Sequence, residues 1–384
     1  MNNEITNPAN LVLIIIGLFL GLTLGIFLLF NNSAKNRANI YLGLLVLLSV
    51  TYFGQGFVFR FDLLERFPHV IGTSKLINFL IGPLTYLYVR ACTQKGFEMK
   101  PILWLHFLPF VLDLIYLSPF FMQSGAEKIN YFLTMVQIGD VQASKLEIML
   151  KSIHAIIYFG FSFQLISQYN KHLKNSTSSI DYAFHSWVLV FIAIHTIPTL
   201  ALIIGFGIFP IYGTYTLVGV LLSFFIFSIA VFIAILVKPE LFHNFPHQIP
   251  IPQSTEEKKQ KYESSNLQEQ QKESYLKKLV QFVELNKPYL ETELTLAQLS
   301  EQINIPSHYL SQVINEKLKC NFLDFINGYR IEEAKEKLAD IKFNHYTIVA
   351  VAFESGFNSK SAFYSAFKKQ VGATPSSYRK SLAS

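Results

Sequence analysis

Five polar side chains able to pair ions or share protons lie inside long apolar runs of the first 238 residues. They are Gln55, Lys75, Asp113, Lys151 and His154. A carboxylate such as Asp113 in apolar surroundings must be protonated, paired or turned toward a wet cavity. Pairing with Lys75 or Lys151 would make the group structural. A cavity would make it a sensor site for a ligand, and the sequence leaves both interpretations open.

The residue patterns of common enzymes are missing from the chain. It has no Walker loop, no G-x-G-x-x-G after a strand, no H-E-x-x-H and no G-x-S-x-G. His106 and Asp113 fall on roughly one helix face, but no third group converges on them. Cys92 and Cys320 have no metal-ligand spacing and are poor disulfide candidates. We therefore predict no catalytic residues, no metal and no cofactor, and a protein that is not an enzyme.

The end of the chain is basic. From residue 342 onward the chain has one acidic side chain, Glu354, and six cationic ones: Lys342, Lys360, Lys368, Lys369, Arg379 and Lys380. Clustered positive charge favours a nucleic-acid partner, because phosphates attract it. A solvated basic face is the alternative. The net charge of +6 does not decide between them, because membrane proteins also use Lys and Arg to fix their orientation.

The sequence that must position these residues has two regions, an apolar N-terminal region and a polar C-terminal one. Of the 384 residues, 51% are hydrophobic and 15% charged, and the mean hydropathy of +0.34 is high for a soluble protein. Seven apolar runs of about 20 residues could each span a bilayer as a helix: residues 11–30, 40–59, 70–89, 102–121, 146–166, 187–207 and 215–237. Residues 1–238 are therefore predicted to form a polytopic transmembrane helical bundle, the sensor domain.

The charges between these runs predict an orientation. Cations with few opposing carboxylates follow every second run: Lys35 and Arg37, then Arg90, Lys95 and Lys100, then Lys171 and Lys174, then Lys238. Such segments face the cytoplasm. The sequence thus predicts a multi-pass protein of the inner (cytoplasmic) membrane, with its N-terminus outside and its C-terminus in the cytoplasm. This topology places the five polar side chains in the outer half of the bilayer.

A polar linker is predicted at residues 239–272. Pro246, Pro250 and Pro252 interrupt helices there, and the residues that follow are rich in Glu, Lys, Gln and Ser. If residues 255–284 are partly helical, four apolar side chains could form a weak dimerising stripe: Leu267, Tyr275, Leu279 and Phe282. A homodimer is therefore one expected assembly.

Residues 273–384 have the pattern of an all-α domain. Thr295 and Gln298 form a capping box, the turn at residues 304–306 ends that helix, and Ser307 begins another. A longer helix over 321–338 carries Phe322 and Ile326 on one side, with Arg330, Lys335 and Lys337 largely off it. After it, Gly356 makes a turn and Ser359 caps a last helix bearing Phe363 and Phe367. These are two helix-turn-helix units.

The last 110 or so residues resemble the AraC-type family of bacterial regulators. The resemblance rests on TLAQLSEQINIPSHYLSQVINEK, on NFLDFINGYRIEEAKEKL and on IVAVAFESGFNSKSAFYSAFKKQVGATPSSYRK. The last stretch is the most specific, because ESGF, the Phe363 and Phe367 pair, the two lysines and the TP-x-x-YR ending occur together. The membrane half resembles, more loosely, the seven-helix sensors fused to such domains.

The resemblance implies that helices 307–317 and 359–369 enter adjacent major grooves of double-stranded DNA. The base-facing residues would be His308, Ser311 and Gln312 on the first helix and Lys360, Ser361, Tyr364 and Ser365 on the second. The phosphate-facing residues would be Asn358, Lys368, Lys369 and Arg379. Neither helix has an arginine on its base-facing side, which puts the strength of base readout in doubt.

These features together predict a membrane-bound one-component transcription regulator. Its partners would be double-stranded DNA, the lipid bilayer and an unknown signal ligand. A membrane transporter or receptor with a regulatory helix-turn-helix tail is the alternative, and the sequence identifies neither the signal nor the target promoters.

Overall fold

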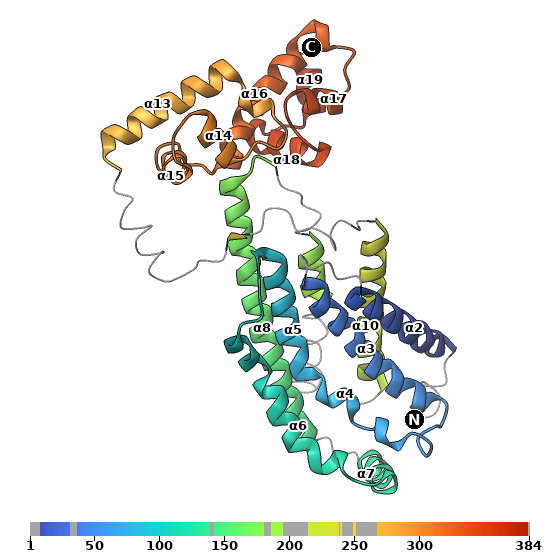
Figure 1. Ribbon diagram of the computed structural model, residues 1–384. Helices are drawn as coiled ribbons and strands as arrows, with labels where there is room; N and C mark the ends of the chain where they lie inside the picture. Colours follow the sequence, from blue (N-terminus) through green and yellow to red (C-terminus); the bar gives the residue numbers. More distant parts are fainter. Residues whose placement is uncertain are drawn as a thin grey trace. The chain divides into compact units, whose positions relative to one another are not determined.

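The computed structural model describes residues 8–30, 37–138, 142–179, 186–194, 214–237, 239, 249–250 and 267–382. The chain forms two compact units (Figure 1). The first holds Met1–Ser167 and Ala183–Ile251, and the second holds Gln168–Tyr182 and Pro252–Ser384. The regular structure of the described residues is helical, apart from one short parallel strand pair, β1 (Gln94–Lys95) with β2 (Ile249–Pro250), and one isolated bridge between Thr177 and Thr295. This confirms the all-α prediction.

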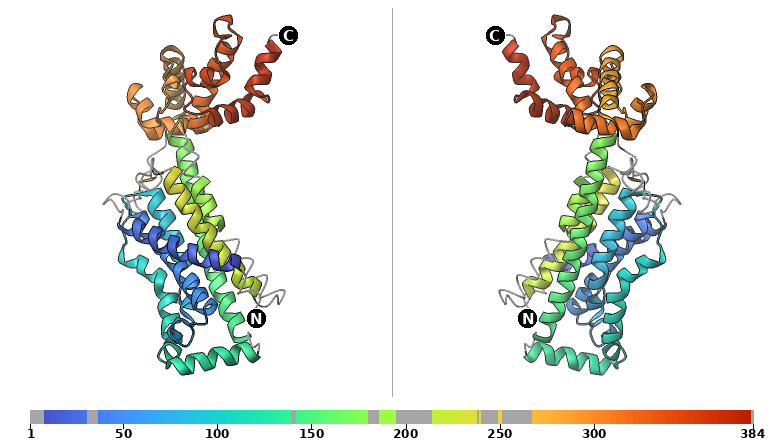
Figure 2. Two further views of the ribbon diagram at one scale, coloured as in Figure 1. Left: turned by 90° about the vertical axis from the view of Figure 1, so that its right-hand side faces the viewer. Right: turned by 90° about the vertical axis from the view of Figure 1, so that its left-hand side faces the viewer.

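Most of the described helices of the first unit follow the apolar runs of the sequence. They are α2 (Pro8–Phe30), α3 (Ala38–Arg60), α4 (Thr73–Leu76), α5 (Asn78–Thr93), α6 (Leu108–Phe121), α7 (Gly125–Ile138), α8 (Gln142–Ser176) and α10 (Thr214–Val237), with short 3-10 helices η1 (Pro68–Val70) and η2 (Pro101–Phe107). Figure 2 shows α7 running crosswise between the ends of α6 and α8 that it connects. The last turns of α8 belong to the second unit.

Three described helices are apolar and long enough to cross a bilayer. They are Ala38–Phe59, Pro101–Phe121 and Met149–Ser176, and a fourth span results if the bent pair Pro68–Leu76 and Asn78–Thr93 is counted as one. Shorter apolar helices cover Ile14–Phe30 and Phe225–Val237. Most of the sixth predicted span, residues 187–207, lies outside the described residues, where only 186–194 is seen as helix.

The third predicted span, residues 70–89, is a bent pair of helices rather than one straight helix. The axis bends by 46° between Leu76 and Asn78. Gly72 precedes α4 with a φ of +82°, a backbone conformation that favours glycine. Pro83 lies buried within α5.

Small residues let α2 and α3 approach closely. A Cβ added at Gly25 would lie 2.5 Å from the Leu47 side chain, and one added at Gly43 would lie 3.1 Å from the Gly25 carbonyl oxygen. Glycine contacts of this kind are typical of helices that pack within a membrane. Large apolar side chains such as Phe19, Trp104 and Ile115 are more than half exposed on the same unit, which fits a surface that faces lipid.

The second unit is a set of short helices around α16 (Phe322–Ala339). Before α16 come α13 (Glu269–Asn286), η4 (Pro288–Leu290), α14 (Leu296–Gln302) and α15 (Ser307–Lys317). After it come η5 (Ile341–Phe343), α17 (Ile348–Glu354), α18 (Lys360–Val371) and α19 (Pro375–Leu382). One apolar core joins α13, α14 and α15 to the first half of α16, and another joins the second half to α17 and α18 (Figure 1).

The apolar stripe on α13 packs inside its own unit. Leu279 and Val283 are fully buried, and Tyr275 and Phe282 pack against the same core. Lys317 on α15 also pairs with Glu269 and Glu273 on α13. The stripe that the sequence offers for weak dimerisation therefore closes the first core of its own unit. The helix begins at Glu269, within the residues predicted as linker.

Candidate nucleic-acid interface

The first helix-turn-helix unit is α14, a turn and α15. Thr295 and Gln298 form the predicted capping box, with each side chain bonded to the other residue's backbone N–H. The Ser300 and Ser307 hydroxyls lie 2.7 Å apart and join the two helices across the turn. Leu310, Val313 and Ile314 are fully buried. This burial turns the opposite face of α15 outward, as the sequence predicts.

The predicted base-facing residues of α15 lie on that outward face. His308 is exposed, whereas Ser311 and Gln312 are half-buried. The Gln312 amide donates to Glu316 Oε1 at 3.0 Å. Glu316 in turn pairs with Lys272 at 2.8 Å. To contact a base, the Gln312 amide must therefore break its hydrogen bond to Glu316 and form one with the edge of the base.

The second unit is α17, a glycine turn and α18. Gly356 has a φ of +87°, and a Cβ there would lie 2.4 Å from the Tyr289 carbonyl oxygen. Phe357 follows it into the core, and the Ser359 hydroxyl caps α18 by accepting from the Ala362 backbone N–H at 3.3 Å. Phe363 and Phe367 are fully buried. The predicted turn, cap and core residues of this unit are all confirmed.

Burial of the two phenylalanines aims the other face of α18 outward. Lys360, Ser361 and Ser365 are exposed, and Tyr364 is half-buried. The Lys360 ammonium lies 5.5 Å from the centre of the Tyr364 ring. These two side chains therefore lie together on the surface predicted to face bases.

The four predicted phosphate contacts differ in availability. Asn358 and Lys368 are exposed. Lys369 is exposed and pairs with Asp324 of α16 at 2.7 Å. Arg379 is half-buried, and its guanidinium donates to the Tyr346 and Phe343 carbonyl oxygens at 2.7 and 3.4 Å. Arg379 thus joins α19 to the residues around η5, which favours a structural role over the predicted phosphate contact.

Arg330 lies at the centre of the second unit, contrary to the prediction that it lies off the buried side of its helix. Its side chain is 1% exposed. Nε donates to the Tyr289 carbonyl oxygen at 2.7 Å, and Nη2 donates to that of Glu291 at 2.7 Å. The guanidinium also lies 5.7 Å from the centre of the Phe357 ring. Burial lowers the pKa of Arg330 to about 10, so the group still carries its charge at neutral pH.

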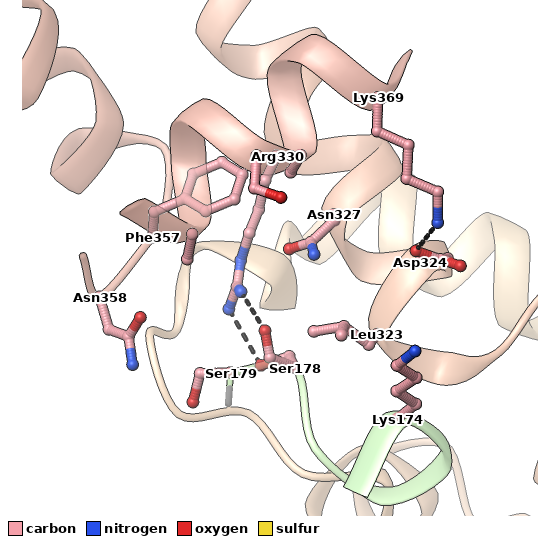
Figure 3. Close-up of a pocket in the computed structure, with 13 residues that line it drawn as sticks. Lys174, Ser178, Ser179, Leu323, Asp324, Asn327, Arg330, Phe357, Asn358 and Lys369 are labelled. Atoms are coloured by element: carbon pink, nitrogen blue, oxygen red, sulfur yellow. Dashed lines mark hydrogen bonds and ion pairs between the residues drawn. The ribbon is translucent and has the colours of Figure 1, made fainter. Parts of the chain in front are cut away.

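The remaining bonds of Arg330 reach the chain that leaves α8. Nη1 donates to the Ser178 carbonyl oxygen at 2.6 Å and Nη2 to the Ser178 hydroxyl at 3.0 Å (Figure 3). The Ser178 N–H donates to the Leu294 carbonyl oxygen at 3.0 Å, and Thr177 forms an antiparallel bridge with Thr295. The sequence places Lys171 and Lys174 in a loop and gives no sign of these contacts.

The polar side chains of the first unit gather around Lys151. Its ammonium lies 2.8 Å from Asp113 Oδ2 and 2.5 Å from Glu147 Oε1. It also donates to the Lys75 carbonyl oxygen at 3.0 Å. Asp113 and Lys151 are both almost fully buried. Of the two partners predicted for Asp113, the structure selects Lys151, and Lys75 contributes its backbone.

The other two predicted sensor residues lie on the elements around this pair. Gln55 Oε1 accepts a hydrogen bond from the Ser74 hydroxyl at 2.7 Å. His154 packs against the Phe79 and Tyr158 rings. Both ring nitrogens of His154 are buried without a hydrogen-bond partner among the described residues. Across the part of the chain that the structure describes, no group of His, Cys, Asp and Glu could hold a metal ion.

Known proteins resemble the end of the chain. A family model described as "Helix-turn-helix domain" matches residues 299–381. Uncharacterized HTH-type transcriptional regulators of Staphylococcus aureus strains MSSA476 and N315 are 34% identical over 91 residues, which is 24% of this chain and 12% of theirs. The melibiose operon regulatory protein of Escherichia coli K12 is 27% identical over 106 residues, 28% of this chain and 33% of that protein.

A solved structure of a protein of unknown function from Listeria innocua is 30% identical, covers 27% of this chain and 94% of its own, and has a TM-score of 0.24. The chain spans 12% of the length of the Staphylococcus relatives. The C-terminal part is a helix-turn-helix domain of the AraC type, as the sequence predicts. Its relatives are transcriptional regulators, in agreement with the prediction that the protein is not an enzyme.

Proposed function

We propose that this protein is a transcription regulator that binds double-stranded DNA through α15 and α18 and is held at the membrane by its first unit. One observation carries the proposal: a single helix, α16, packs against both helix-turn-helix units, while the polar faces of α15 and α18 point away from their cores.

The length of α16 suits this role. It has 18 residues, and at 1.5 Å per residue this is about 27 Å. Successive major grooves on one face of DNA are about 34 Å apart. A connector of this length can hold two recognition helices near the spacing of adjacent grooves. Lys360 and Gln312 would contact bases, and Asn358, Lys368 and Lys369 would contact phosphates.

The apolar helices of the first unit support a location in the bilayer. We place the protein in the inner membrane, with its N-terminus outside and the second unit in the cytoplasm, on the charge pattern between the apolar runs. Binding of an external or membrane-soluble signal would change the DNA affinity of the second unit. Such a change equals the signal's differential binding to two states, commonly about 1 to 3 kcal/mol.

A transporter with a regulatory tail is the second candidate for the first unit. The buried group around Asp113 and Lys151 suits it as well as a receptor, because charged residues inside membranes often mark transport pathways. A flux assay in sealed vesicles separates the two, since a receptor binds its signal without net transport.

The DNA-binding proposal is tested with the full-length protein in phospholipid nanodiscs. Selection from a random duplex library should yield a sequence motif, and affinity should fall steeply as salt rises, because phosphate contacts release counterions. Lys360→Ala should relax the base preference. Lys335→Ala is the matched control, because Lys335 pairs with Glu332 on α16. Failure to bind any duplex at low salt would refute the proposal.

A further inference from the structure

A small polar pocket opens beside the second recognition helix and includes the end of α8. Its volume is about 130 Å³. Lys174 and Ser179 line it from the α8 side, and Asn358, Ser365 and Lys369 line it from the residues of the second helix-turn-helix unit (Figure 3). Three of these five residues, Asn358, Ser365 and Lys369, are ones that the sequence assigns to DNA contacts.

The charges around this pocket are mainly positive. Lys174, Lys369 and Arg330 line it together with one carboxylate, Asp324. Asp324 forms an ion pair with Lys369. Both side chains are partly exposed, so the pair is weak and an anion can replace the Asp324 carboxylate as the partner of Lys369. No described carboxylate pairs with Arg330, which donates to carbonyl oxygens and to the Ser178 hydroxyl. The pocket therefore favours an anion.

The neutral lining residues can add hydrogen bonds to such an anion. Ser179, Ser365 and Asn358 carry hydroxyl or amide donors. Asn327 also lines the pocket, and its Oδ1 is buried without a partner among the described residues. Rotation of that amide would present its NH₂ group to an incoming anion.

We propose that this pocket binds one phosphodiester group of the DNA backbone, with Lys174 and Lys369 as its two charged donors. The inference rests on the proposed function and deepens it. The ligand follows from position, because a backbone phosphate must pass close to the exposed face of α18 when that helix lies in a groove. Lys369 exchanges Asp324 for the phosphate on binding.

The hydrogen bonds that hold Ser178 in the second unit also fix the position of Lys174 near the pocket. Lys174 lies four positions before Ser178, whose backbone and hydroxyl are held by hydrogen bonds to Arg330 and Leu294. The end of a helix whose earlier residues belong to the apolar unit thus carries a DNA contact. DNA affinity then depends on where the end of α8 is held.

The test compares three variants in nanodiscs of phosphatidylcholine, using the selected duplex. Lys174→Gln and Lys369→Gln should each lower affinity about fivefold at 0.1 M salt, and each should reduce the slope of log affinity against log salt by about one. The loss should be the same for selected and unrelated sequences. Lys171→Gln is the matched control, because Lys171 is exposed on the same end of α8 but does not line the pocket; it should change affinity less than twofold.

A variant that is expected to strengthen DNA binding distinguishes loss of the phosphate contact from simple damage to the fold. Asp324→Asn removes the carboxylate that competes for Lys369 and keeps the shape, so it should strengthen binding severalfold. Unchanged affinity and salt slope in Lys174→Gln, with weakened binding in Lys369→Gln, would overturn the shared pocket while leaving the proposed function intact. So would a Lys174→Gln effect that appears only in nanodiscs with anionic lipid and not in those of phosphatidylcholine. A wild-type protein that binds no duplex would overturn both.

Discussion

Arg330 and Ser178 are 152 residues apart in the chain, yet the Arg330 guanidinium donates to both the carbonyl oxygen and the hydroxyl of Ser178. The same guanidinium bonds to the carbonyl oxygens of Tyr289 and Glu291 at the entry to the first helix-turn-helix unit. One buried side chain therefore joins three separate stretches of the second unit. Thr177 and Ser178, which directly follow α8, are therefore part of that unit's structure.

Arg330→Met should destabilise the second unit by about 3 kcal/mol, because several buried carbonyl oxygens would lose their donor. Hydrogen exchange of the full-length protein in nanodiscs measures this as lost protection in α16 and in residues 289–294. Lys335→Met on the same helix is the control, and its surface ion pair with Glu332 predicts a change below about 0.5 kcal/mol. Equal protection in both variants would show that the Arg330 contacts contribute little.

Two glycines with similar backbone angles should respond differently to alanine. Gly356 has a φ of +87° and no room for a Cβ beside the Tyr289 carbonyl oxygen, so Gly356→Ala should cost about 3 kcal/mol. Gly372 has a φ of +78° with open space around it, so Gly372→Ala should cost about 1 kcal/mol from backbone strain alone. Hydrogen exchange, measured as the temperature rises, compares the stability that the second unit loses in the two variants. A similar loss in both would mean that crowding at Gly356 is relieved by a small backbone shift.

Local signals in the sequence predicted the helix-turn-helix units well. The Thr295 capping box, the Gly356 turn and the Ser359 cap are each set by neighbouring residues, and the structure confirms all three. Arg330 was misplaced because its partners are distant in sequence. A signal was nevertheless present, since Ile326, Arg330 and Ala334 recur every four residues on the buried face of α16.

The first unit shows the same limit of prediction from sequence. Hydropathy located the apolar helices but did not reveal the break between Leu76 and Asn78, although Gly72 was a local sign of it. The sequence leaves Asp113 two possible lysine partners, because span assignments alone do not fix how each helix is rotated about its axis. The sequence places the end of α8 in a loop, because charge patterns mark the side of the membrane and not the end of a helix.

Glu333 should make the second unit sensitive to acid. Partial burial alone would raise its pKa, but hydrogen bonds from Lys287 and Lys337 outweigh burial and lower the pKa of Glu333 below its ordinary value. The folded state thus binds fewer protons than the unfolded state, so the stabilisation is present at neutral pH. It is lost as the pH falls from the ordinary glutamate pKa of about 4.3 through the lower folded value.

Glu333→Gln should remove part of this acid sensitivity. Protection of the α16 amides, followed from pH 7 down to about pH 3 and corrected for the intrinsic exchange rate, should fall less steeply in the variant than in the wild type. Glu332→Gln is the control, because the Glu332 side chain is 67% exposed. An identical pH dependence in Glu333→Gln and the wild type would contradict the assignment.

Asp113→Asn should lower both the abundance and the thermal stability of the first unit. The Asp113 carboxylate and the Lys151 ammonium are 2.8 Å apart and almost fully buried, so the substitution leaves a buried cation with Glu147 as its remaining ion-pair partner among the described residues. Breaking a buried pair in this way costs about 3 kcal/mol or less, depending on how far the lysine can reach toward water.

A double variant separates a structural pair from a sensor group. Asp113→Asn combined with Lys151→Met removes both charges, so it should recover much of the stability that the single change loses. Abundance in membranes and thermal unfolding of the purified full-length protein measure this, and Glu147→Gln serves as the control for the more exposed partner of Lys151. If Asp113→Asn instead keeps normal abundance and stability while altering the response of a reporter promoter to its signal, the carboxylate belongs to the sensor and not to the scaffold.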